Sequence, residues 1–440
     1  MRAMLKKSKI SVKTFLQQLY ITVQLYSGNG LANHAAACAY GFLLSMAPIL
    51  LLIAFILFFT LKASPMAITG LIGNISILEG IFDEEWFIND YFIIVRPGLS
   101  GVISAVSVIW AGMILSISMQ RGLKITFPGG KVRNPIVNTL VILFIEAVVL
   151  IIILAAIFSS RTAIWLYREL NFLPNISITS RIGMRVFSVL ALWFLAFFAY
   201  SFIPANHPRK LSALKGAFLY ALVYSCIAFI LDYILNISRY NFLYGTLGSL
   251  VVLLINVYFF FNFFLLGAQF VYVTDSFDAL VFTKLRQINN AAVKEAEPKR
   301  SAPKRVMPWL THKLFFPIDG GMKRYLRHYE MGGVIFSQGD SGDDIFYLLD
   351  GEVEIFLSAL QDDGSADVIK AGSFFGEMGH LLSEERNATI RAKTDVSVFV
   401  LPPSLFDTVL KYDSSLDMDI IEHISRRLKS TDEAISKLRQ

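Results

Sequence analysis

Long apolar runs alternate with short polar segments between residues 34 and 273. Six of these runs are long enough to cross a bilayer, at about 20 residues each. Ahead of them, Phe15, Leu19, Val23 and Tyr26 recur at helical spacing, which is typical of an amphipathic helix at a membrane interface. The pattern predicts an all-α polytopic membrane domain over residues 1–286, with spans at about 34–61, 101–120, 136–158, 184–203, 216–237 and 247–273.

The pattern changes abruptly after residue 286. Residues 287–309 are polar, charged and proline-bearing, without an apolar period, and they predict a linker. Residues 310–440 form a second domain. Its last segment, Ser414–Leu438, places apolar residues at a period of 3.6, which predicts an amphipathic helix.

Composition agrees with a membrane protein. The chain is 55% hydrophobic with a mean hydropathy of +0.56, more apolar than soluble proteins at about 45–50%. Basic residues gather at the N-terminus, in residues 121–133 and in residues 208–215, whereas residues 62–97 are acidic. The positive-inside rule then places both termini in the cytoplasm. No basic stripe interleaved with aromatic residues occurs, so we expect no nucleic-acid partner.

Four polar residues fall inside the predicted spans: Glu146, Asp232, Asn256 and Asn262. Ionisable groups at such positions usually face a cavity or a partner, which favours a polar path for a solute or protons. The alternative is that the asparagines only bond neighbouring helices. For Asp232, solvation near an interface also stays open.

The sequence contains no pattern of catalytic or metal-binding residues that would indicate an enzyme. Its six histidines are scattered, and a phosphate-binding Gly-x-x-x-x-Gly-Lys-Ser/Thr loop is missing. Cys38 and Cys226 both lie in apolar runs, where they indicate neither a disulfide framework nor a metal site. We therefore predict no catalytic activity, no metal and no cofactor.

One segment, Phe374–Ala392, combines residue types that bind a phosphorylated nucleoside. Gly376 and Glu377 open a short helical run, where free backbone N–H groups favour an anion. Arg386 follows nine residues after Glu377, and its guanidinium can bind a phosphate bidentately. The segment predicts a socket for a small phosphorylated nucleoside.

The same segment resembles the phosphate-binding cassette of cyclic nucleotide-binding domains, F-G-E-x-A-L followed by P-R-x-A-T. The resemblance implies a C-terminal β-roll (a double-stranded β-helix, jelly-roll-like) with flanking α-helices. It also implies that Glu377 binds the ribose 2′-hydroxyl and Arg386 the cyclic phosphate. The chain departs from the pattern at Gly379, His380 and Glu385. The residues predicted to line the site are Phe375, Gly376, Glu377, Met378, Arg386, Asn387, Ala388 and Thr389.

A second resemblance covers the membrane region. The segment from Ala35 to Pro48 is similar to the A-x-x-x-A-Y-x-x-L-L-S-x-x-P pattern of the YihY/BrkB membrane family, once misassigned as ribonuclease BN. Ile203–Asn206, Tyr244–Gly248 and Leu266–Gln269 match further patterns of that family. The resemblance implies a transport or envelope role.

Together these features predict a transporter-like or envelope-maintenance protein of the bacterial inner membrane, regulated by a cyclic nucleotide. Its expected partners are membrane lipid and the cyclic nucleotide, and a homo-oligomer stays open. Asn387 favours cAMP slightly over cGMP. A cyclic-nucleotide-gated channel is one alternative, although the 238–245 loop is too short for a pore helix and filter. The other alternative is a membrane scaffold whose sensor-like domain binds nothing.

Overall fold

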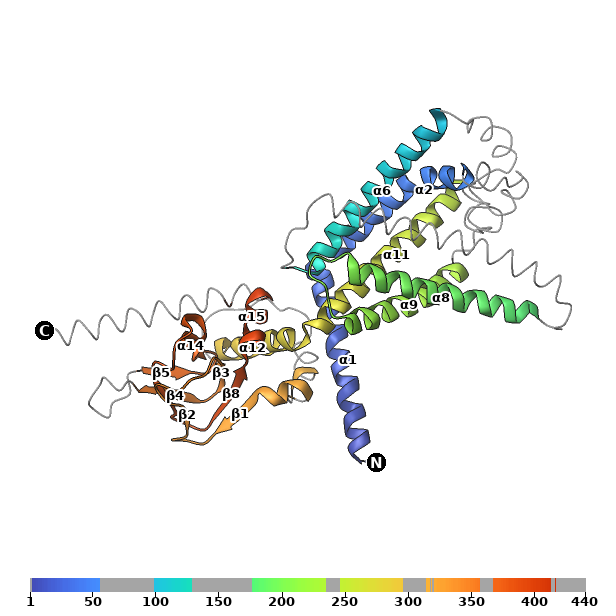
Figure 1. Ribbon diagram of the computed structural model, residues 1–440. Helices are drawn as coiled ribbons and strands as arrows, with labels where there is room; N and C mark the ends of the chain where they lie inside the picture. Colours follow the sequence, from blue (N-terminus) through green and yellow to red (C-terminus); the bar gives the residue numbers. More distant parts are fainter. Residues whose placement is uncertain are drawn as a thin grey trace. The chain divides into compact units, whose positions relative to one another are not determined.

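The computed structural model describes residues 2–55, 99–128, 176–234, 246–295, 314–316, 318, 320–356, 367–412 and 416. The predicted span at 136–158, with Glu146, lies outside these residues, as does nearly all of the predicted helix Ser414–Leu438. The chain divides into two compact units (Figure 1). The helical unit comprises residues 22–275, and the β-roll unit comprises residues 1–21 together with 276–440.

The helical unit is built around its last helix. Helix α11 packs against α2, α6 and α9, while α2 runs along α6 and α8 along α9 (Figure 1). Two segments of the described residues, Lys210–Leu231 and Val251–Asp275, are long and apolar enough to cross a membrane. Helices α2, α6, α8, α9 and α11 overlap five of the six predicted spans. The bounds are α1 Arg2–Gly28, α2 Leu31–Phe55, α6 Leu99–Thr126, α8 Ile176–Phe202, α9 Lys210–Ile234 and α11 Thr246–Asp275.

Helices α9 and α11 approach closely where each carries a glycine. A Cβ atom on Gly216 would lie 2.1 Å from Cγ2 of Val271, and one on Gly267 would lie 2.5 Å from the hydroxyl of Tyr200. That hydroxyl donates a 2.7 Å hydrogen bond to the carbonyl of Phe264. Small residues are common where helices pack in a membrane, because they let backbones approach.

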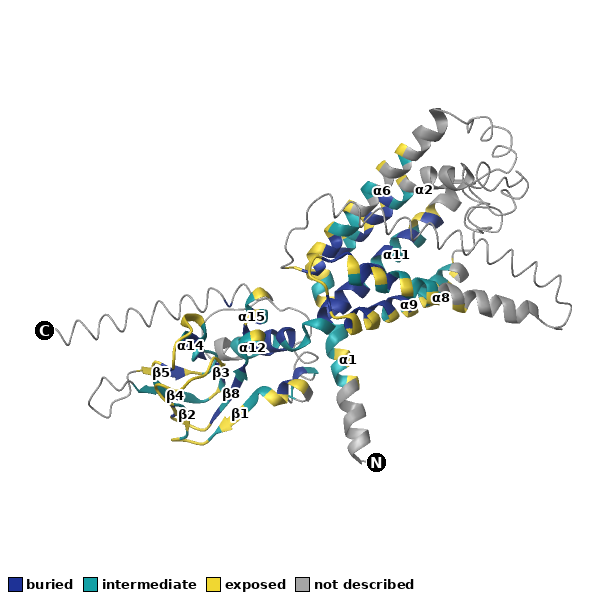
Figure 2. Cartoon of the chain, viewed as in Figure 1, coloured by how far each residue is buried: buried dark blue, intermediate teal, exposed yellow. Residues whose placement is uncertain are grey.

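The β-roll unit contains two four-stranded antiparallel sheets, with strand orders β1-β8-β3-β6 and β2-β7-β4-β5. Their facing sides enclose an apolar core, drawn dark blue in Figure 2, that includes Phe346, Leu348, Val353, Phe375 and Val398. This architecture confirms the expected roll. The strands are β1 Leu326–Tyr329, β2 Val334–Phe336, β3 Ile345–Asp350, β4 Glu352–Phe356, β5 Asp367–Lys370, β6 Phe374–Phe375, β7 Thr389–Ala392 and β8 Val396–Leu401.

A single residue, Ser276, separates the end of α11 from helix α12, Phe277–Glu295, which belongs to the β-roll unit. Its Phe282 is fully buried against three rings of the roll. The ring centroids lie 5.5 Å from Tyr347, 5.6 Å from Phe399 and 6.2 Å from Phe374, all edge to face. Such aromatic pairs contribute about 0.5–1.5 kcal/mol each beyond their buried area.

The C-terminal half of α12 is also docked, by polar bonds. The hydroxyl of Tyr347 donates to Oδ1 of Asn290 at 3.0 Å and accepts from Nδ2 of Asn289 at 3.3 Å. Asn289 Nδ2 also donates to the carbonyl of Leu349. The prediction of a linker from residue 287 is therefore wrong for residues 287–295. The segment is helical, and asparagines bond the roll where apolar residues would be expected.

Short helices flank the strands of the roll: η3 Gly320–Tyr325, α14 Glu377–Leu382 and α15 Pro403–Tyr412. Helix α15 packs against α12. Phe406 of α15 contacts Phe374 with ring centroids 5.9 Å apart. Phe374, immediately before the cassette turn, therefore contacts both helices.

Candidate nucleotide site

The turn between β6 and α14 requires glycine. Gly376 has a φ of 76°, in the left-handed region that favours glycine. A Cβ atom there would lie 2.9 Å from Nη1 of Arg386 and 3.1 Å from Cδ2 of Phe346. Gly376 thus permits both the sharp turn and the close approach of the guanidinium.

Arg386 is only 5% exposed and is fixed by two backbone carbonyls. Its Nη1 donates to the carbonyl of Gly376 at 2.6 Å, and its Nη2 donates to the carbonyl of Asp344 at 2.8 Å. The guanidinium carbon lies 4.6 Å from the ring centroid of Phe336 and 5.5 Å from that of Phe346. The sequence predicted Arg386 at the site, but not the two rings or the Asp344 carbonyl.

The loop between β2 and β3 is joined by its backbone to the segment that carries Arg386, between α14 and β7. The Arg386 amide donates to the carbonyl of Asp340 at 3.0 Å, and the Gly339 amide donates to the carbonyl of Arg386 at 2.9 Å. Thr389 contributes its hydroxyl, which accepts from the Gln338 amide at 3.0 Å. Thr389, predicted to line the site, thus holds this loop in place.

Charge at the site is mixed. Burial lowers the pKa of the Arg386 guanidinium, and the carboxylates of Asp344, Asp343, Asp340 and Glu377 oppose that shift. Glu377, in the first turn of α14, is 2% exposed. A guanidinium has five N–H donors, and the two bonds to carbonyls leave three for an anion. The site can therefore pair a buried cation with a phosphate and a nearby carboxylate with a hydroxyl.

The other predicted site residues differ in their surroundings. Phe375 is fully buried and stacks on Phe346 with ring centroids 5.2 Å apart, so it belongs to the core of the roll. Met378 and Ala388 are half-buried, and Asn387 is exposed.

The predicted intramembrane path is only partly described. Asn256 Nδ2 donates to the carbonyl of Val252 on its own helix at 3.0 Å, and Asn262 Oδ1 accepts from the hydroxyl of Tyr26. The Asn262 bond joins α11 to α1, as the helix-bonding alternative expects, whereas the Asn256 bond stays within α11. Asp232 lies on α9, with its side chain outside the described residues, as is the whole of Glu146.

Sequence reasoning missed an ion pair that joins two helix ends. Arg209, just before α9, donates from Nε to Oδ1 of Asp275 at 2.8 Å. Its Nη2 donates to the Asp275 carbonyl, and Ser212 donates from its hydroxyl to the same carboxylate oxygen. A cation at the last carbonyls of α11 also suits the helix dipole. The sequence signal was a basic loop preceding one span and an aspartate closing the next.

Comparison with known proteins agrees with this geometry. Residues 326–413 match the family model of the cyclic nucleotide-binding domain, so Arg386 and Glu377 lie in a domain of that class. Residues 22–282, more than half of the chain, match the family model described as virulence factor BrkB. The chain belongs to the BrkB family of membrane proteins and carries a C-terminal cyclic nucleotide-binding domain.

Curated relatives match the C-terminal domain alone. The chain is 37% identical over 82 residues to a cAMP-dependent protein kinase regulatory subunit of Pyricularia oryzae, covering 19% of this chain and 20% of that protein. It is 31% identical over 87 residues to cGMP-dependent protein kinase 2 of Homo sapiens, covering 20% of this chain and 11% of that protein. The chain thus spans about a fifth or less of these relatives. Among solved structures, the catabolite activator protein of Thermus thermophilus is 26% identical, with 26% of this chain and 54% of that chain covered and a TM-score of 0.24.

Proposed function

We propose that this protein is a bacterial inner-membrane protein with a transporter-like or envelope-maintenance role, regulated by cAMP or cGMP binding to its C-terminal domain. In this proposal the chain crosses the membrane six times, with both termini in the cytoplasm, where cyclic nucleotides are made. The observation that supports it best is the buried Arg386 guanidinium, oriented by the carbonyls of Gly376 and Asp344 within a cyclic nucleotide-binding domain.

The chemistry of the site suits a cyclic nucleotide. Arg386 would bind the cyclic phosphate through the N–H groups that remain after its two carbonyl bonds. Glu377 would accept a hydrogen bond from a ribose hydroxyl. Because the guanidinium is already oriented and stacked on Phe336, binding would cost little side-chain entropy.

Helix α12 supplies a route from the ligand to the membrane helices. Its first residue follows α11 after a single residue, and its Phe282 contacts Phe374, which immediately precedes the cassette. A ligand can shift an equilibrium only through contacts that differ between two states. We infer that nucleotide binding changes the packing of Phe374 and thereby of α12.

Calorimetric titration of the full-length protein in nanodiscs with cAMP, cGMP and cyclic dinucleotides tests the proposal. Wild type should bind cAMP or cGMP, and Arg386→Ala should lose about 2–4 kcal/mol of binding free energy. The control is Arg391→Ala, because the Arg391 guanidinium also lies over a ring, that of Phe356, but at an exposed position of β7. If millimolar nucleotide produced no binding heat and no thermal shift, the result would contradict the proposal and favour the scaffold alternative.

A further inference from the structure

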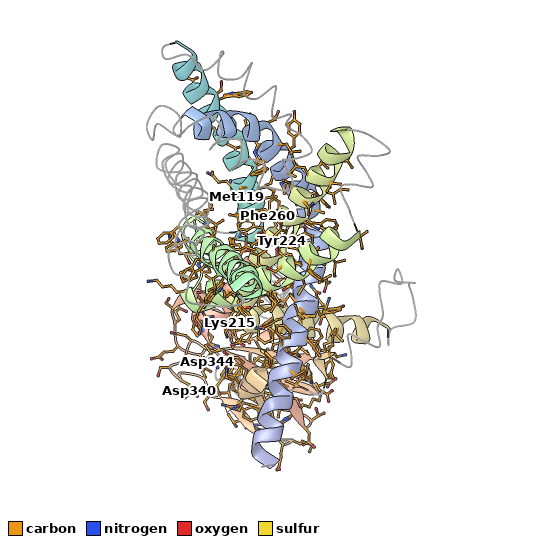
Figure 3. All side chains as sticks on the ribbon, turned by 90° about the vertical axis from the view of Figure 1, so that its right-hand side faces the viewer. Met119, Lys215, Tyr224, Phe260, Asp340 and Asp344 are labelled. Atoms are coloured by element: carbon orange, nitrogen blue, oxygen red, sulfur yellow. The ribbon has the colours of Figure 1, made fainter. Side chains whose placement is uncertain are left out.

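Three aspartates lie on a loop that is bonded to Arg386. Asp340, Asp343 and Asp344 lie on the loop between β2 and β3, and all three are exposed. We call them the acidic loop; Figure 3 labels its first and last members. Burial lowers the pKa of the Arg386 guanidinium, and the carboxylates of these three residues and of Glu377 all act against that shift.

The backbone holds the acidic loop against Arg386. The carbonyl of Asp344 accepts from Nη2 at 2.8 Å, and the carbonyl of Asp340 accepts from the Arg386 amide at 3.0 Å. A Cβ atom on Gly342, between them, would lie 3.6 Å from Nη2. Oδ2 of Asp340 also accepts from the Ser337 amide at 2.7 Å. The backbone of the acidic loop is therefore held beside the Arg386 guanidinium, and its charged side chains project from there.

We propose that the acidic loop is a specificity determinant that makes this site accept a singly charged cyclic phosphodiester and reject the doubly charged phosphomonoester of the same nucleoside. The proposal rests on the proposed function and adds the basis of ligand discrimination. A cyclic phosphodiester carries one negative charge, whereas a phosphomonoester carries about −1.5 to −2 at pH 7. The single guanidinium compensates the first charge by direct bonds, and the second charge meets the carboxylates.

The same arrangement reverses the usual effect of salt. Arg386 is buried, and its close contacts are screened little, whereas the carboxylates of the acidic loop are exposed and are screened strongly. Added salt therefore weakens repulsion more than attraction. Cyclic nucleotide affinity should hold or rise with salt, whereas affinity at an ordinary basic anion site falls.

Competition titration of the full-length protein in nanodiscs of zwitterionic lipid tests this inference, with the pairs cAMP and 5′-AMP, and cGMP and 5′-GMP. The test variant, Asp343→Asn/Asp344→Asn, removes two charges at constant size. Glu330→Gln/Asp367→Asn removes two charges from exposed positions elsewhere on the roll and serves as the control. We expect the ratio of monoester to cyclic dissociation constants to fall about threefold to tenfold in the test variant and to stay unchanged in the control.

Wild-type cAMP or cGMP affinity should also hold or rise between about 50 and 500 mM NaCl. An unchanged ratio in Asp343→Asn/Asp344→Asn, or a wild-type affinity that falls steeply with salt, would overturn the inference while cyclic nucleotide binding itself persists. A wild-type protein that binds neither cyclic nucleotide overturns the proposed function as well, so the two failures are distinguishable.

Discussion

Replacing Arg386 by lysine should destabilise the β-roll even without a ligand. The substitution keeps the positive charge but removes the planar fork that reaches two carbonyls, those of Gly376 and Asp344. A residue that served only to bind a ligand would leave the unliganded domain unchanged. Arg386→Lys therefore separates a structural role from a purely ligand-binding one.

The structure sets the size of the effect. The two carbonyl bonds, at 2.6 and 2.8 Å, are charge-assisted, and such bonds contribute about 1.5–3 kcal/mol each. A lysine ammonium can replace one of them at most, and it loses the guanidinium contact at 4.6 Å from the ring centroid of Phe336. We expect a loss of about 2 kcal/mol in the free energy of unfolding. For a unit of the size of the β-roll unit, that corresponds to a fall of about 4–8 °C in melting temperature.

Differential scanning calorimetry of the full-length protein in detergent measures this effect. The unfolding transition of the β-roll is recognised as the one whose melting temperature changes when nucleotide is added. Nucleotide affinity should fall as well, by about thirtyfold for 2 kcal/mol. Arg391→Lys is the matched control. The Arg391 guanidinium carbon lies 4.9 Å from the ring centroid of Phe356, but Arg391 is exposed and lies on β7. Equal melting temperatures for Arg386→Lys and Arg391→Lys would refute the reasoning, since the two carbonyl bonds would then contribute nothing.

Three further predictions concern other parts of the chain. Gly267→Ala should destabilise the helical unit by about 1–3 kcal/mol and lower its melting temperature, because the added methyl would meet the hydroxyl of Tyr200. Gly28→Ala is the control, because a Cβ atom there meets no atom within 4 Å. Equal melting temperatures for the two variants would contradict the close contact at Gly267. Tyr347→Phe removes the hydroxyl bonds to the two α12 asparagines and should cost about 1–2 kcal/mol, seen as faster hydrogen exchange in α12. Unchanged exchange would argue against this docking. In intact cells an impermeant thiol reagent should label Glu84→Cys and spare Lys124→Cys, and the reverse result would overturn the topology.

The cassette could be predicted because its chemistry is local in sequence. Gly376 and Arg386 lie in one motif, and the structure confirms that the guanidinium reaches the glycine carbonyl. The rings of Phe336 and Phe346 could not be predicted in the same way. They come from strands much earlier in the chain, and only the pairing of β2 with β7 and of β3 with β6 brings them to the arginine.

Helix α12 was missed for a different physical reason. Sequence patterns identify a helix by an apolar stripe, but here the stripe is short and continues as Asn289 and Asn290. Those amides face the roll because Tyr347 offers a hydroxyl that both donates and accepts. A buried polar contact of this kind has no hydrophobic period, so the segment resembles a linker in the sequence.

The departures from the cassette pattern also have physical consequences. A Cβ atom on Gly379, where the resemblance expects alanine, would lie 3.3 Å from Nη1 of Arg386, so glycine leaves room for the guanidinium against α14. His380, where leucine is expected, lies with Nε2 3.0 Å from Oδ1 of Asp407 and thereby links α14 to α15. The arginine that would bind the phosphate also holds the cassette together through its bonds to the carbonyls of Gly376 and Asp344. Ligand affinity and the stability of the unliganded roll therefore depend on one side chain, and a substitution at Arg386 must change both.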